Sequence, residues 1–124
     1  MIANEASGSG GDALPWMFKH NQLGPLVGKR TWGGLVGISA TPALMDGGHV
    51  TSPDVAFFSP QGQWDVENHG VDPDVPVEQD PKAVAAGHDP QLEAAVALAL
   101  QKLPATPEAP RRPAYPVYPI KPAT

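Results

Sequence analysis

Ala6-Ser7-Gly8-Ser9-Gly10-Gly11-Asp12-Ala13 is the stretch of this 124-residue chain that decides the fold. The apolar run Met1-Ile2-Ala3 before it is typical of the end of a strand, and the stretch after it, up to Asn21, is typical of a helix. Pro15 is tolerated only in a first helical turn, so the helix must begin near Gly10 to Asp12. The pattern predicts a strand that passes into a helix at a glycine-serine junction.

A serine at such a junction has the surroundings that a nucleophile needs. The hydroxyl of Ser9 requires a base to take its proton, and the oxyanion formed by its attack requires hydrogen-bond donors. The first N–H groups of a helix have no partner within the helix, so the N–H of Gly10 is a natural oxyanion donor. The same run also fits a flexible linker, a helix-entry turn or a phosphate-binding turn, although no Gly-Lys-Ser/Thr follows it.

The middle of the chain predicts short strands that are broken by glycine. Strand-like stretches lie at residues 26–28, 31–38, 49–51, 55–58 and 64–67, with a hairpin turn over residues 59–63. Gly33, Gly34 and Gly37 indicate a close approach of backbone segments. Residues 72–80 read as an acidic loop interrupted by proline. The tryptophans at positions 16, 32 and 64 could line a substrate cleft, but we expect them to anchor the core.

The last helix has the clearest signals. Asp89 is a good N-cap and Pro90 suits the first helical position, while Leu103-Pro104 ends the helix. The helical period places one set of apolar residues on a single face, which we expect to be buried: Leu92, Val96, Ala99, Leu100 and Leu103.

A proline-rich tail follows, in which every third residue is proline: Pro104, Pro107, Pro110, Pro113, Pro116, Pro119 and Pro122. Polyproline II has three residues per turn, so these prolines share one edge. We therefore divide the chain into a domain over residues 1–104 and a tail over residues 105–124. The tail suits a passive spacer, a strap over a neighbouring subunit or a ligand for an aromatic groove.

Composition excludes several kinds of site and partner. The chain has no cysteine, so disulfides and thiolate metal sites are excluded, and its four histidines lack metal-ligand spacing. A net charge of −5 argues against nucleic acid as a partner. No apolar run approaches the ~20 residues that span a bilayer. The first residues do not form a signal peptide. We expect no metal, no nucleic acid and no membrane partner, and the absence of cysteine fits a cytoplasmic location.

Five separate motifs carry a family resemblance: Ala3–Ala13, Gly28–Gly37, Asp46-Gly47-Gly48, Val66–Asp74 with its Val66-Glu67-Asn68-His69-Gly70, and Asp89–Glu93. In this order they resemble the catalytic core of the tricorn-type serine peptidases, which are relatives of the tail-specific peptidases. The resemblance runs from residue 3 to about residue 103. It implies an α/β fold of the crotonase or Clp-peptidase type, of which this chain supplies the second half.

The resemblance assigns roles to three residues. Ser9 matches the nucleophile, the N–H of Gly10 matches an oxyanion donor, and Glu67 matches the acid of the Ser–His–Ser–Glu tetrad. Such an acid orients the base indirectly, through a second serine. Taken alone, Glu67 reads as a surface carboxylate at a strand end. The resemblance implies a serine-type peptidase that cleaves peptides through an acyl-enzyme without a metal or cofactor and that forms a homo-oligomer.

The histidine base is missing from the matching part of the chain. The family places it upstream of the nucleophile, but only eight residues precede Ser9 and none is histidine. We therefore expect a fragment that lacks the upstream half of its domain and is inactive alone. In the lysine-dependent relatives the base falls where this chain has Gly34, and Lys29 is not at the matching position. The local histidines are His20, His49, His69 and His88. His69 is the most attractive candidate among them, because alternation along a strand would place it on the same face as Glu67.

A non-catalytic reading stays open beside the enzymatic one. In that reading the domain is a remnant, and the chain serves assembly or binding through its proline-rich tail. The enzymatic reading predicts that replacing Ser9 abolishes turnover, whereas the binding reading predicts that removing residues 105–124 abolishes the function.

Overall fold

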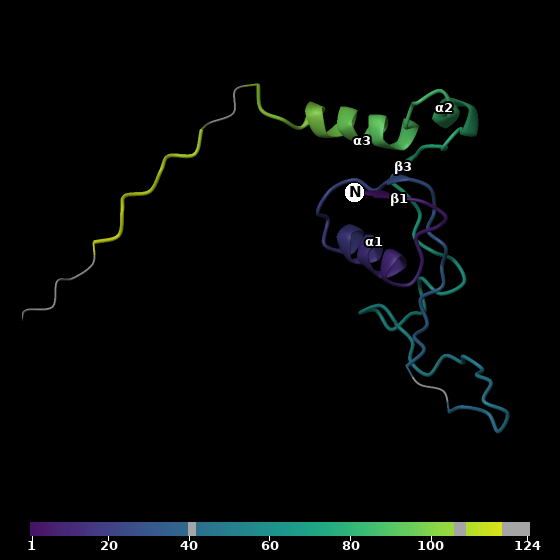
Figure 1. Cartoon of the computed structure of the whole chain (residues 1–124). Coiled ribbons are helices and arrows are strands. Elements are labelled where there is room, and N and C mark those ends of the chain that lie inside the picture. The colour runs from purple at the N-terminus through teal and green to yellow at the C-terminus, as the bar shows by residue number, and fades with distance from the viewer. Residues whose placement is uncertain (40–41, 106–108, 118–124) are drawn as a thin grey trace, which may run out of the picture.

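The computed structural model describes residues 1–39, 42–105 and 109–117 of the chain. Its helices and strands, in chain order, are β1 (Ile2–Ala3), α1 (Gly10–His20), β2 (Val27–Gly28), β3 (Val75–Pro76), α2 (Pro81–Ala85) and α3 (Pro90–Gln101) (Figure 1). The predicted junction is confirmed, because β1 is followed by a turn and then by a helix that begins at Gly10.

The three strands form a small parallel sheet in the order β1-β2-β3. Ile2 pairs with Val27, which pairs in turn with Val75. Parallel neighbours need a crossover connection, and α1 provides it between β1 and β2. Figure 1 shows α1 on one side of the sheet and α3 on the other, and α3 contacts β1 and β2. The architecture is therefore a thin sheet between two helices.

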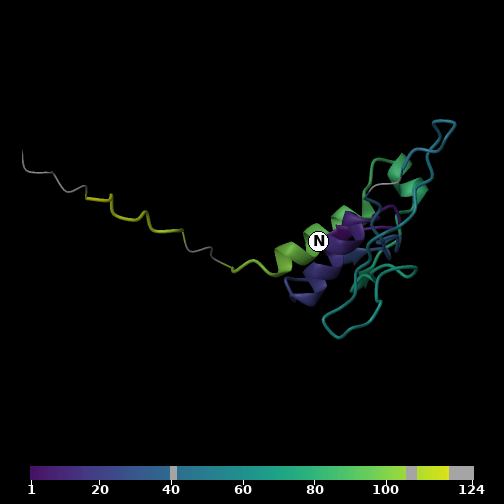
Figure 2. The same cartoon turned by 90° about the horizontal axis from the view of Figure 1, so that it is seen from below.

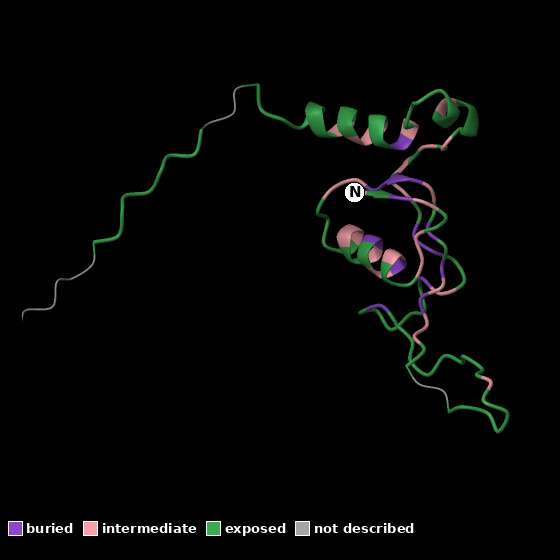
Figure 3. Cartoon of the chain, viewed as in Figure 1, coloured by how far each residue is buried: buried purple, intermediate pink, exposed green. Residues whose placement is uncertain are grey.

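The core of this sheet is small. Leu26 and Val27 are fully buried, and Ala3, Leu35, Val66 and Val71 are nearly so (Figure 3). The expectation that all three tryptophans anchor the core is wrong. Trp16 packs against the core, but Trp32 is 69% exposed and Trp64 is 71% exposed.

Most of the predicted middle strands are loops. Residues 31–38, 49–51, 55–58 and 64–67 form no strand, and pairing among them is limited to an antiparallel bridge between Gly37 and Val55. Residues 59–63 form a turn, with a 2.8 Å hydrogen bond from the N–H of Ser59 to the carbonyl of Gln63, but the two strands that it was predicted to join are absent. Conversely, β3 lies within the predicted acidic loop of residues 72–80, and α2 directly follows that loop. Asp80 begins α2 by accepting a bond from the N–H of Lys82.

The final helix is confirmed, but its buried face is not the predicted one. Asp89 caps α3 by accepting a 3.0 Å hydrogen bond from the N–H of Leu92. Buried Gln91 faces the sheet, and its amide donates to the carbonyl of Val77 at 2.9 Å. Gln91 thus belongs to the face of α3 that lies against the sheet. This face leaves four large apolar residues of the predicted face exposed: Leu92, Val96, Leu100 and Leu103.

The described part of the tail, residues 109–117, is exposed and contains no helix or strand. It runs away from the rest of the chain in both views (Figures 1 and 2). The prolines at positions 107, 119 and 122 lie outside the described residues. Within the described ranges, no helix is long and apolar enough to span a bilayer.

We predict that this chain, produced alone, associates through its exposed apolar side chains, because such patches are unfavourable in water. Light scattering and dye binding on the purified chain measure this association. The double substitution Leu92→Gln and Leu100→Gln on α3 is expected to reduce it. The matched control is Val117→Gln, since Val117 is 93% exposed but lies in the tail. A monomer with a sharp cooperative melt would contradict the prediction.

Candidate active site

Ser9 is held in an uncommon backbone conformation at the start of α1. Its φ is 53° and its ψ is −110°, a region that non-glycine residues rarely occupy. Such a conformation costs about 1–3 kcal/mol and persists only where the surroundings fix it, often at functional sites. The side chain of Ser9 is exposed and makes no capping bond to the helix. The hydroxyl is thus presented at a strand-to-helix turn, as in a nucleophile elbow.

A closed ring of three hydrogen bonds fixes this backbone. The N–H of Ser9 donates to the carbonyl of Gly34 at 3.0 Å. The N–H of Gly34 donates to the carboxylate of Asp12 at 3.2 Å, and the N–H of Asp12 donates to the carbonyl of Ser9 at 2.9 Å. Asp12 is fully buried, and its other oxygen accepts from the N–H of Gly33 at 2.8 Å.

The indole of Trp32 covers this ring from the outside. A Cβ atom on Gly8 would lie 2.6 Å from Cε3 of Trp32, and a Cβ on Gly34 would lie even closer to the same side chain. The backbone of Trp32 is tied to the same segment, since its N–H donates to the carbonyl of Ser7 at 2.9 Å. Both glycines are therefore needed for close packing beside Ser9, as the glycine pattern predicted for Gly34.

Glu67 is anchored by one of its two carboxylate oxygens. Oε2 accepts hydrogen bonds from the N–H groups of Leu35 at 2.6 Å and Val36 at 2.7 Å. The residue is half-buried, and within the described ranges Oε1 accepts no hydrogen bond. One oxygen thus fixes the side chain while the other is available to a further donor.

Ser9 and Glu67 line the same open groove, which has a volume of about 530 Å³. Apart from these two, the lining consists of Trp32, Gly33, Gly34, Val36, Ile38, Pro53 and Asn68. The third predicted residue, Gly10, is the first residue of α1, and the space beside its Cα is open. Among the described residues, the groove contains no histidine or lysine, and no cluster suits a metal ion.

The local candidates for a base are held elsewhere. His69 does not share a strand face with Glu67, because residues 67–69 form a turn in which Asn68 has a φ of 62°. Nε2 of His69 lies 3.0 Å from a carboxylate oxygen of Asp72. Lys29 pairs with Glu78 at 2.9 Å, and this hydrogen bond raises the pKa of the Lys29 ammonium, which opposes a role as base.

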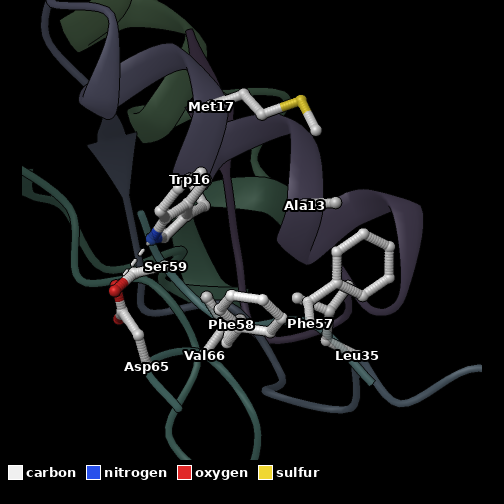
Figure 4. Close-up of a pocket in the computed structure, with 9 residues that line it drawn as sticks. All are labelled: Ala13, Trp16, Met17, Leu35, Phe57, Phe58, Ser59, Asp65 and Val66. Atoms are coloured by element: carbon white, nitrogen blue, oxygen red, sulfur yellow. Dashed lines mark hydrogen bonds between the residues drawn. The ribbon is translucent and has the colours of Figure 1, made fainter. Parts of the chain in front are cut away.

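A second, apolar pocket lies beside the groove (Figure 4). Its walls come from α1 and the loops around residues 57 and 65: Ala13, Trp16, Met17, Leu35, Phe57, Phe58, Ser59, Asp65 and Val66. The indole N–H of Trp16 donates to Asp65 at 2.8 Å, so the one carboxylate in the lining is already paired. Leu35 connects the two sites, because its N–H binds Glu67 while the residue also lines the pocket. The pocket suits an apolar group.

Sequence reasoning missed two parts of this site. It assigned no role to Asp12, whose only signal was an acid placed directly after Ser9-Gly10-Gly11. It also missed the apolar pocket, because Phe57 and Phe58 were assigned to a strand. The groove itself brings together Ser9 and Glu67, which are 58 positions apart in the sequence.

Comparison with known proteins identifies the relatives of this site. The family model described as peptidase family S41 matches residues 1–77. Tricorn protease homolog 1 of Streptomyces coelicolor is 52% identical over 85% of this chain, and the tricorn protease of Thermoplasma acidophilum is 44% identical over 82%. The crystal structure of the tricorn protease matches 82% of the chain with a TM-score of 0.77 and 44% identity.

The matched region is a small part of each relative. This chain covers 10% of the length of both curated proteins and of the solved chain. The family model covers more than half of the chain and includes the residues that form the groove around Ser9 and Glu67. This chain belongs to peptidase family S41.

Proposed function

We propose that this chain carries the nucleophile Ser9, the oxyanion donor Gly10 and the supporting acid Glu67 of a serine peptidase, and that the base is supplied by residues outside it. Membership of a peptidase family supports a peptidase function. The proposed residue roles rest on the groove that Ser9 and Glu67 share. Ser9 is strained and Glu67 is anchored there, and the groove has space for a further group.

The chemistry follows from the groups that the groove presents. A base in the groove takes the proton of the Ser9 hydroxyl as its oxygen attacks the peptide carbonyl. The N–H of Gly10, at the start of α1, stabilises the oxyanion, helped by the helix dipole. The amine product leaves with a proton from the base, and water then cleaves the acyl-enzyme. Oε1 of Glu67 accepts a hydrogen bond from the hydroxyl or imidazole that orients the base.

The wider architecture is part of the same proposal. The parallel sheet with its α1 crossover supports the second half of a crotonase or Clp-peptidase type α/β domain over residues 1–104. The missing base then lies in the upstream half of that domain. Peptide substrates, a homo-oligomer and a cytoplasmic location remain predictions.

Two substitutions test the residue roles in the protein purified from its source with variants at the native locus. We expect Ser9→Ala to abolish turnover of a fluorogenic peptide and covalent labelling by a fluorophosphonate. Glu67→Gln keeps the shape but removes the charge, and we expect it to lower kcat by about 10²- to 10⁴-fold. Glu93→Gln, on exposed α3, is the matched control and should leave kcat unchanged. Unchanged turnover in Ser9→Ala would overturn the proposal.

The tail supports a second role, in binding rather than catalysis. The guanidinium of Arg112 lies 4.3 Å from the ring centroid of Tyr115, a cation–π contact between residues three positions apart. One turn of polyproline II has three residues, so this contact fits the proline period. Tyr115 and Val117 nevertheless remain 74% and 93% exposed. The tail therefore suits a partner with an aromatic-lined groove or a neighbouring subunit.

Removing residues 105–124 separates the two roles. We expect the shortened protein to keep its fluorophosphonate labelling and to lose tail-dependent assembly, which native size measurement detects. A sharper variant, with Pro110→Ala, Pro113→Ala and Pro116→Ala, keeps length and charge but removes the preformed polyproline conformation. If assembly and co-purifying partners persist in both variants, the tail has no binding role.

A further inference from the structure

Asp12 is a buried carboxylate to which the proposed chemistry assigns no task. It lies in the first turn of α1, three residues after Ser9, and it is fully buried. Building on the proposed function, we infer that Asp12 is a positioning residue that fixes Ser9 relative to Glu67 through the loop of residues 33–36.

Asp12 is linked to the proposed nucleophile by backbone hydrogen bonds. Its N–H donates to the carbonyl of Ser9, and its carboxylate holds Gly34, whose carbonyl accepts from the N–H of Ser9. The N–H of Ser9 is thereby bound to the loop that the Asp12 carboxylate holds, while the carbonyl of Ser9 accepts the first helical N–H groups, those of Asp12 and Ala13. This ring explains how a non-glycine residue is kept at a φ of 53°.

Asp12 is also linked to Glu67, through the loop of residues 33–36. Asp12 accepts the N–H groups of Gly33 and Gly34, and Glu67 accepts those of Leu35 and Val36. The four donors are consecutive, so the two carboxylates hold adjacent halves of one short loop. A fifth hydrogen bond, from the N–H of Asn68 to the carbonyl of Gly33 at 2.7 Å, ties the loop to the turn that carries Glu67.

The arrangement requires a carboxylate at position 12. Each of its oxygens faces a separate backbone N–H, at 2.8 and 3.2 Å. An asparagine has one oxygen, and its NH₂ group would face a donor. The loop would then shift at Gly33 or Gly34 and carry Leu35 and Val36 with it. A displacement of about 1 Å between reacting groups is enough to cost about 10²-fold in rate.

Asp12→Asn tests this inference in the intact protein from its source. We expect kcat to fall by about 10²-fold while KM stays within about twofold. The matched control is Asp74→Asn, because Asp74 also holds a backbone N–H, that of Leu26 at 2.8 Å, and lies outside the groove. Melting temperatures of both variants show whether their losses of stability are comparable.

The readout that separates positioning from general stability is the coupling to Glu67. If Asp12 acts by fixing Ser9 relative to Glu67, then Asp12→Asn costs less than about tenfold when Glu67→Gln is already present. An equal fall in kcat in both backgrounds, or a fall no larger than that of Asp74→Asn, overturns the inference. An unlabelled wild-type protein would instead refute the proposed function itself, and the positioning role with it.

A second variant covers the case in which Asp12→Asn does not fold. Gly34→Ala adds a methyl group that would clash with Cζ3 of Trp32, so Gly34 and the indole must move apart. It disturbs the residue whose N–H and carbonyl both belong to the ring around Ser9. We expect kcat to fall with KM unchanged. A folded Gly34→Ala protein with wild-type kcat overturns the inference.

Discussion

Four consecutive backbone N–H groups, from Gly33 to Val36, are held by two carboxylates, and the candidate site depends on this arrangement. A chain segment whose N–H groups bind carboxylates cannot use them in a sheet, and this is why residues 33–36 form no strand. The same bonds place Asp12 and Glu67 on the two halves of that loop. Ser9 is included because its N–H binds the carbonyl of Gly34.

In this arrangement, Ser9 combines a strained backbone with an exposed side chain. Ser9 adopts an unfavourable backbone conformation and leaves its hydroxyl outside the helix cap. Glu67 keeps one oxygen free of bonds within the described residues. Both face one groove with room for another group. A groove that holds the proposed nucleophile and the proposed acid, with no histidine or lysine among its lining residues, fits the proposal that this chain is part of an S41 peptidase domain.

The sequence predicted the starts of α1 and α3 better than the loops between them. The junction at Ser9 was readable because glycine and serine favour a turn before a helix, and Asp89 and Pro90 likewise marked the start of α3. Pro15 was wrongly predicted to lie in the first helical turn, since it is the sixth residue of α1. Glu67 was found only through family resemblance. Asp12 was missed because its partners are backbone N–H groups, which no side-chain pattern reveals.

The sequence also failed to predict which side chains share a buried face. The helical period grouped Leu92 with Val96 and Leu100, yet the residue that meets the sheet is Gln91. Periodicity identifies a face but not the neighbour that covers it. The predicted strand that joined Glu67 and His69 failed for a related reason, because Asn68 turns the backbone between them.

The central claim is that Ser9 is the nucleophile of a peptidase whose base lies outside this chain. The most direct measurement is fluorophosphonate labelling in an extract of the source cells, capture with an antibody against the tail, and mapping of the labelled peptide. The account predicts a label on Ser9 in a protein larger than the 13.0 kDa of this chain, or in a complex that contains it. A captured protein without a label on Ser9 would contradict it.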